Sequence, residues 1–169
     1  YLSKGVGMAV GSIKIASMLI LIGSIVGGLL VAILRRFGQI NLIKNMLIAW
    51  PILLLVAALA TNHTFLIGLM FLLGVTFSMV FAASRSLYAT FVPVSERAEY
   101  FSVYVIFERM GAIIGPIGWS VSVAAFMFMG ESAAYKIAML VTSLIAFGSI
   151  LVLRKVINLQ KQKTNLLDK

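Results

Sequence analysis

Long apolar stretches alternate with short polar stretches along the whole chain. A helix needs about 20 predominantly apolar residues to cross the hydrocarbon core of a bilayer. The pattern predicts about five spans of this kind, at residues 13–34, 42–60, 65–91, 98–129 and 135–153. Because the polar connections are short, successive spans are expected to run antiparallel. We therefore predict an all-α, multi-pass transmembrane helical bundle that forms a single domain over residues 1–169 and ends in a polar tail, 154–169.

Charged and proline residues mark where the spans end or bend. Arg35 and Arg36 follow the first span. Pro93 is expected to end the third span, because a proline disfavours the helical conformation in the residue before it. Pro116 lies inside the fourth span and is expected to bend it, because it cannot donate a hydrogen bond to the carbonyl four residues back.

Composition supports the membrane interpretation and excludes several kinds of chemistry. Hydrophobic residues make up 62% of the chain and charged residues 11%, against about 45–50% and 25% in soluble domains. The chain has no cysteine and one histidine, His63, so thiol catalysis, disulfides and a histidine-cluster metal site are excluded. No metal or cofactor is predicted. A membrane enzyme would need a convergent set of acid, base, nucleophile or metal ligands, which the sequence does not offer.

The basic residues predict the orientation in the membrane. The formal net charge is +9, and most basic residues stand between or after the apolar spans, which favours a membrane over a nucleic-acid partner. One side carries nine basic residues: Arg35, Arg36, Lys44, Arg97, Arg154, Lys155, Lys161, Lys163 and Lys169. The other side carries three: Lys4, Lys14 and Lys136. Because cytoplasmic loops are enriched in Lys and Arg, we expect a multi-pass cell-membrane protein whose segment starts outside and ends in the cytoplasm.

Three charged residues are predicted deep inside the spans, well away from their ends, where charge is costly and usually functional. Arg85 lies roughly 12 Å into the membrane from the cytoplasmic end, and Glu108 roughly 16 Å, at 1.5 Å per residue. Arg109 is one residue deeper. Since the third and fourth spans are antiparallel neighbours, Arg85 and Glu108 are expected to approach within salt-bridge distance. The alternatives are that Arg85 extends to the cytoplasmic interface and that Glu108 forms a purely structural pair with Arg85 or Arg109.

Polar, aromatic and small residues share faces on these spans. On the third span one face carries Gly74, Ser78, Phe81, Arg85 and Tyr88, and on the fourth Tyr104, Glu108, Gly111, Gly115 and Gly118. The polar faces are expected to point to the bundle interior or to a wet cavity, so we predict a solute path or gate at Ser78, Arg85, Tyr88, Tyr104, Glu108 and Arg109. Residues expected to serve as close-packing or hinge positions are Gly23, Gly27, Gly111, Gly115 and Pro116.

The third and fourth spans resemble a known family. The segments Ser84–Tyr88 (SRSLY), Val92-Pro93 and Glu96–Phe101 (ERAEYF) resemble the "SRSL…P…AEFF" stretch of the vacuole-effluxer-like permeases, also described as autophagy-related permease-like, which are a branch of the major facilitator superfamily. The likeness extends to Tyr104, Arg109 and Gly115-Pro116.

A second segment, after the first span, is similar to the superfamily's cytoplasmic loop motif, although it departs from it. The segment Arg35–Gly38 (RRFG) looks like a remnant of the pattern G-x-x-x-D-R-x-G. Val31 stands where the motif has glycine, and Arg35 where it has aspartate, so the charge relay of the motif is not carried over. Glu108 stands where a small residue is expected, and its role is not carried over either.

The resemblance implies a register and a function. The five spans would match helices 8 to 12 of a twelve-helix transporter, with an N-terminal helical bundle of the same protein missing upstream. The third span would line the central cavity, the first and fourth would flank it, and the second and fifth would be peripheral. The implied function is secondary active transport, as a permease or effluxer, of small polar solutes, amino acids among them, by alternating access in a lipid bilayer. From the chemistry of the residues themselves, and not from the resemblance, Arg85, Ser78 and Tyr88 would contact solute or hold a gate, and Glu108 would carry a coupling proton, with sodium as the other candidate ion.

A second class of function stays open at this point. The chain would serve equally as a structural or assembly subunit of the membrane without transport of its own, and a degraded loop motif suits that role. The intramembrane Arg85 and Glu108 favour the transporter, because a passive scaffold has little need of charges that are costly in lipid.

Overall fold

The computed structural model describes residues 1–34, 36 and 38–167, with side chains up to residue 158. Arg35 and Phe37 of the loop segment and the last two residues of the tail lie outside this description. The described residues form five long helices: α1 (Val10–Leu34), α2 (Gln39–Leu59), α3 (His63–Phe91), α4 (Arg97–Phe126) and α5 (Glu131–Leu167). Short 3₁₀ helices at Val94–Glu96 (η2) and Met127–Met129 (η3) flank α4.

The predicted all-α bundle is confirmed, because each of the five helices is long and apolar enough to cross a membrane. The helices begin up to four residues before the predicted spans, and α5 continues to Leu167, well beyond the predicted end of the last apolar stretch at residue 153. Helix α4 is continuous through Pro116. Asn62 caps α3, since its side chain accepts hydrogen bonds from the backbone N–H groups of Thr64 and Phe65 at 2.9 and 3.2 Å.

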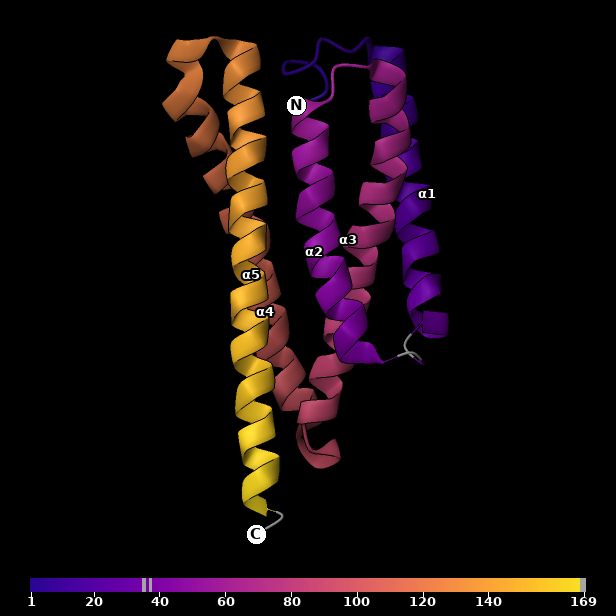
Figure 1. Cartoon of the computed structure of the whole chain (residues 1–169), viewed down its shortest axis with the longest axis vertical. Coiled ribbons are helices and arrows are strands. Elements are labelled where there is room, and N and C mark those ends of the chain that lie inside the picture. Colours follow the sequence, from indigo (N-terminus) through magenta and orange to yellow (C-terminus); the bar gives the residue numbers. More distant parts are fainter. Residues whose placement is uncertain (35, 37, 168–169) are drawn as a thin grey trace.

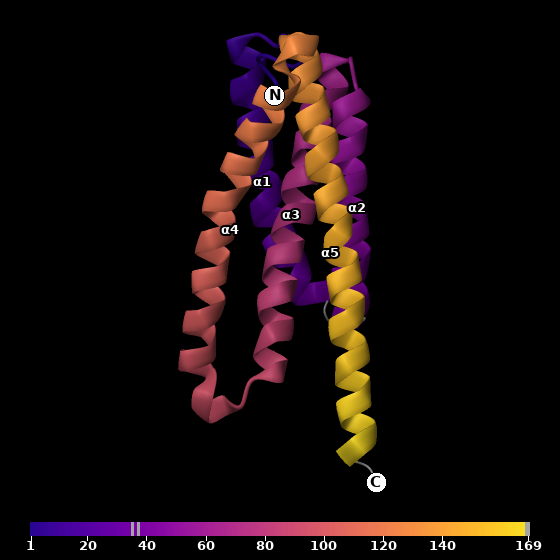
Figure 2. The same ribbon diagram turned by 90° about the vertical axis from the view of Figure 1, so that its left-hand side faces the viewer.

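The helices run up and down, so that every connection lies at one of the two ends of the bundle (Figure 1). Helix α3 packs along α1 and α2, while α5 packs along α2 and α4. The C-terminal part of α5 extends past the other helices at the end where α1 meets α2 (Figure 1). Turning the molecule by 90° shows α4 standing away from α3 over most of its length (Figure 2).

The contact between α1 and α3 depends on glycines. A Cβ atom on Gly23 would collide with the backbone carbonyl of Phe71, and one on Gly27 would collide with that of Val75. From the opposite side, a Cβ atom on Gly74 would collide with the carbonyl of Ile20. The two backbones therefore lie closer than any larger residue would permit at Gly23 and Gly27, which are two of the positions predicted for close packing.

Buried side chains gather among α1, α2, α3 and α5, and α4 contributes little to them. The core contains residues such as Leu54, Leu66 and Met139. Within the described part of the chain, Val123 is the buried residue of α4, and it packs with Ala134 and Ala138 of α5. Helix α4 is thus held mainly through its C-terminal half, and its N-terminal half stands free to line a cavity.

Candidate functional site: a cavity between α2, α3 and α4

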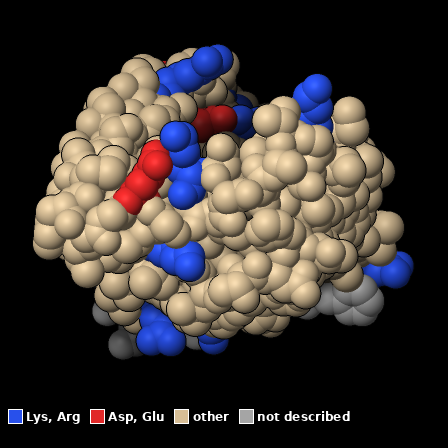
Figure 3. All heavy atoms as spheres, turned by 90° about the horizontal axis from the view of Figure 1, so that it is seen from above, with Lys and Arg blue, Asp and Glu red and all other residues tan. Residues whose placement is uncertain are grey.

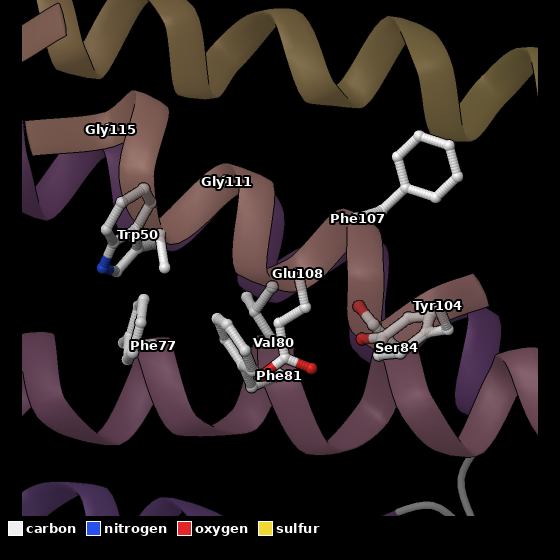
Figure 4. Close-up of a pocket in the computed structure, with 11 residues that line it drawn as sticks. Trp50, Phe77, Val80, Phe81, Ser84, Tyr104, Phe107, Glu108, Gly111 and Gly115 are labelled. Carbon is white, nitrogen blue, oxygen red and sulfur yellow. The ribbon is translucent and has the colours of Figure 1, made fainter. Parts of the chain in front are cut away.

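A cavity of about 630 Å³ separates α4 from α2 and α3. This volume falls in the range of small-molecule sites. The lining is mostly aromatic and aliphatic, with few polar groups. Figure 4 shows Phe77, Phe81 and Glu108 between α3 and α4, whereas the Phe107 ring points away from them. The lining residues are Trp50, Phe77, Val80, Phe81, Ser84, Tyr104, Phe107, Glu108, Gly111, Ala112 and Gly115.

The predicted salt bridge between α3 and α4 is confirmed, and it bounds this cavity. Nη2 of Arg85 donates to both carboxylate oxygens of Glu108, at 2.6 and 2.7 Å. The Arg85 side chain is 52% exposed and that of Glu108 is 26% exposed. The carboxylate of Glu108 is therefore the more enclosed partner, and the guanidinium keeps a path out of the pair.

A continuous aromatic wall runs from α2 along α3 towards this salt bridge. The ring centroids of Trp50 and Phe77 are 5.8 Å apart, and those of Phe77 and Phe81 are 4.9 Å apart. Cζ of Arg85 stands 5.9 Å from the centroid of the Phe81 ring, within the reach of a cation–π interaction. The guanidinium of Arg85 therefore contacts both the aromatic wall, at Phe81, and the carboxylate of Glu108.

A second aromatic group closes the gap between α3 and α4 near their connecting turn. The Tyr88 ring lies 5.1 Å from Tyr104 and 5.3 Å from Phe101, measured between centroids. The Tyr88 hydroxyl donates to the backbone carbonyl of Tyr100 at 3.0 Å. The predicted site residues Tyr88 and Tyr104 therefore lie together, beside Arg85 and Glu108.

Other predicted residues lie elsewhere. The Ser78 side chain faces α1, where its Oγ would be 3.4 Å from a Cβ atom on Gly28, and it does not line the cavity. Arg109 is exposed, and no ion pair joins it to any other residue in the described part of the chain. Gly111 and Gly115 border the cavity, but a Cβ atom on either would meet no described atom within 4 Å, so the close helix contact expected there is not present among the described residues.

Trp50, Phe77 and Ser84 are among the lining residues that sequence reasoning missed. A signal for two of them exists, because Phe77, Phe81 and Ser84 recur at helical spacing on one face of α3. Trp50 had no comparable signal. It stands beside Pro51 on α2, a helix expected to be peripheral, and only the packing of α2 against α3 brings its ring to the cavity.

Most of the other charged side chains lie near the two ends of the bundle, away from this site. Seen from the end that holds the α4–α5 turn, the surface is mostly uncharged, with a few basic and acidic side chains (Figure 3). At that end Lys4 pairs with Glu131 at 3.2 Å. No group of metal-ligating side chains occurs among the described residues. The cavity, with its salt bridge, is the place where the described structure concentrates polar and aromatic groups inside the spans.

Fold and site together define a polytopic helical membrane protein with a solute-sized cavity between its helices. The chain matches the family model of the Major Facilitator Superfamily over residues 1–166. It belongs to the Major Facilitator Superfamily, a superfamily of membrane transporters. No curated protein and no solved structure matches the chain.

Proposed function

We propose that this chain forms part of a secondary active transporter that works by alternating access, in which helical bundles rock around a central site. One observation carries the proposal: the Arg85–Glu108 salt bridge bounds the cavity and joins two helices that otherwise touch mainly at their connecting turn. A pair of this kind can close and open, because neither helix is held against the other by a buried core.

The Arg85–Glu108 pair acts as a latch in this mechanism. When the pair is closed, α4 is held near α3, and the Tyr88–Tyr104 contact seals the cavity towards the connecting turn. When it opens, Glu108 becomes available to a coupling ion, a proton or sodium, and Arg85 to solute. Charges left alone inside a membrane are costly, so opening requires a partner for each, which is how binding would drive the movement.

The exposed face of α4 supports a further bundle of the same protein as the missing partner. Gly111, Gly115 and Gly118 have no described atom near a hypothetical Cβ, although small residues at this spacing typically receive another helix. An upstream N-terminal bundle would cover this face and complete the cavity. We therefore expect residues 1–169 alone to fail to transport.

The orientation follows from the basic residues, and the expected location is the cell membrane. Nine basic positions against three favour a cytoplasmic C-terminal end and an outside start. Single cysteines at Asn62 and Glu131 should react with an impermeant maleimide from outside intact cells, whereas those at Gln39 and Gln162 should react only after permeabilisation. Labelling of Gln162→Cys in intact cells would reverse the orientation.

Transport is tested by reconstituting the intact protein in liposomes. By the resemblance, the solutes are small and polar, with amino acids among them, so a panel of radiolabelled amino acids under an imposed proton or sodium gradient is the first probe. We expect accumulation by the intact protein, at least tenfold less in Arg85→Ala and Glu108→Gln, and normal accumulation in Glu99→Gln, an exposed acid of the same helix. Folded intact protein that moves none of these solutes, and exchanges none across the bilayer, would favour the structural subunit.

A further inference from the structure

We propose that the cavity between α2, α3 and α4 binds hydrophobic organic cations, with Glu108 as the counter-ion and the Trp50–Phe77–Phe81 wall as the apolar surface. The binding site stands by itself, whereas its use as a route across the membrane rests on the proposed function. The ligand class follows from which charges line the cavity, which of them can leave, and what already occupies the site.

Among the described residues that line the cavity, one side chain is charged, and it is an acid. Glu108 lines the cavity together with eight apolar or glycine residues and two hydroxyl-bearing ones, while Arg85 reaches its carboxylate from beside the cavity. A solute anion inside would stand among aromatic faces, which carry negative partial charge, next to a carboxylate. A solute cation would be attracted by both.

Arg85 occupies the position that we assign to the ligand. Its guanidinium pairs with Glu108 and stands over the Phe81 ring, which are the two contacts that an organic cation would make. The arginine is in effect a tethered cation, and a free cation competes with it for the same carboxylate.

The two partners of the salt bridge differ in their freedom to leave. Arg85 is half exposed, and its long side chain can carry the guanidinium towards the cytoplasmic end of α3. Glu108 is shorter and more enclosed, so it stays with the cavity. Exchange of one cation for another leaves the carboxylate paired throughout, whereas an incoming anion would have to draw Arg85 away and strand Glu108 in apolar surroundings, which is costly.

The aromatic wall supplies the rest of the recognition. Trp50, Phe77 and Phe81 form a continuous surface with centroid separations of 5.8 and 4.9 Å, and Figure 4 shows the Glu108 side chain extending from α4 towards Phe81, at one end of this surface. Faces of Trp and Phe attract organic cations, most strongly where water is excluded. The fitting solute is therefore a bulky cation with an aromatic or aliphatic body, of a size suited to about 630 Å³.

Tetraphenylphosphonium is a suitable probe, because its charge does not depend on pH and tetraphenylborate is an anion of nearly the same shape. Binding of the radiolabelled cation to the intact protein in detergent should be saturable. Glu108→Gln should weaken it at least tenfold, Phe77→Ala should weaken it several-fold, and Arg85→Ala should tighten it at least threefold by removing the competing cation. Glu99→Gln is the matched control and should bind as the unaltered protein does.

Several results would overturn the proposal. These are saturable binding that survives Glu108→Gln, equal loss in Arg85→Ala and Glu108→Gln, competition by tetraphenylborate at similar concentrations, or no saturable binding because another helix of the intact protein fills the cavity. If Glu108→Gln does not fold, Glu108→Asp, Phe77→Ala and Arg85→Ala still decide the matter. Loss of cation binding with intact amino-acid transport would refute this ligand class alone, whereas cation binding without any transport would refute the transporter.

Discussion

Helix α3 meets α1 on one side and α4 on another, and both neighbours carry glycines at a spacing that permits close contact between helices. Against α1 the contact is made: a Cβ on Gly27 would strike the carbonyl of Val75. Towards α4 it is not made. Gly111 and Gly115 face open space, and the link across the gap is the Arg85–Glu108 salt bridge with the tyrosines beside it.

The comparison teaches that a small-residue pattern permits a contact without specifying the partner. In a bilayer, helix association comes from packing and hydrogen bonds, because lipid tails are as apolar as the side chains. The α1–α3 contact combines close backbone packing with a hydrogen bond of 3.4 Å from the Ser24 hydroxyl to the Gly74 carbonyl, and contains no charged pair. The α3–α4 contact uses a charged pair across a cavity, and a charged pair can be exchanged. The first contact suits a rigid unit, and the second suits a moving part.

The largest effect is expected where the backbones are closest. Gly27→Ala places a methyl group against the Val75 backbone, which cannot move aside without separating the helices. Overpacking costs about 1–3 kcal/mol, and an obstacle made of backbone favours the upper end. The thermal midpoint of the intact protein in detergent should fall clearly. The control is Gly68→Ala, also on α3, whose methyl group would have no described atom of another helix within 4 Å. This control should leave stability unchanged or raise it by up to about 1 kcal/mol. Equal midpoints for the two variants would show that α1 and α3 are not in contact.

The fold could be predicted from the sequence because its cause is local and repeated. Apolar runs of membrane length and charged connections specify helices and their alternation without any knowledge of packing. The Arg85–Glu108 pair could also be predicted, because depth in a membrane is proportional to distance along a helix. Both residues are located by counting from the α3–α4 turn.

The rest of the site depends on packing that the sequence does not state. Ser78 and Phe81 lie on one face of α3 by periodicity, yet Ser78 turns towards α1 and Phe81 towards the cavity, because the two neighbours approach that face from different sides. Trp50 reaches the cavity only because α2 packs along α3. The apolar pattern gives the end of the last span but not the end of α5, since a helix can continue into water after its apolar stretch has ended.

A second prediction concerns the exchangeable contact. Arg85→Ala should destabilise the intact protein more than the double change Arg85→Ala with Glu108→Ala, because the single change leaves a carboxylate without its partner in apolar surroundings. A double-mutant cycle scored by thermal stability should give a coupling of about 0.5–3 kcal/mol, the range for residues in direct contact. If the two effects add without coupling, the salt bridge does not form in the membrane-embedded protein, and α4 is held by α5 alone.

The smallest expected effect on stability concerns two serines whose hydrogen bonds lie in different surroundings. Ser143 of α5 is buried, with 1% of its surface exposed, and its Oγ donates to the carbonyl of Pro51 on α2 at 2.8 Å. Ser122 of α4 is only partly buried, and its Oγ donates an exposed hydrogen bond to the Gly118 carbonyl of its own helix, also at 2.8 Å. Hydrogen bonds between membrane helices contribute about 0.6 kcal/mol on average and up to about 1.7.

Ser143→Ala should therefore lower stability within that range, whereas Ser122→Ala should change it little, because the Ser122 bond joins no second helix. Thermal unfolding of both variants of the intact protein measures the difference. Loss of stability in Ser122→Ala equal to that in Ser143→Ala would mean that α4 is packed as tightly as α5 in the intact protein, and the contrast between a fixed and a movable side of α3 would no longer hold.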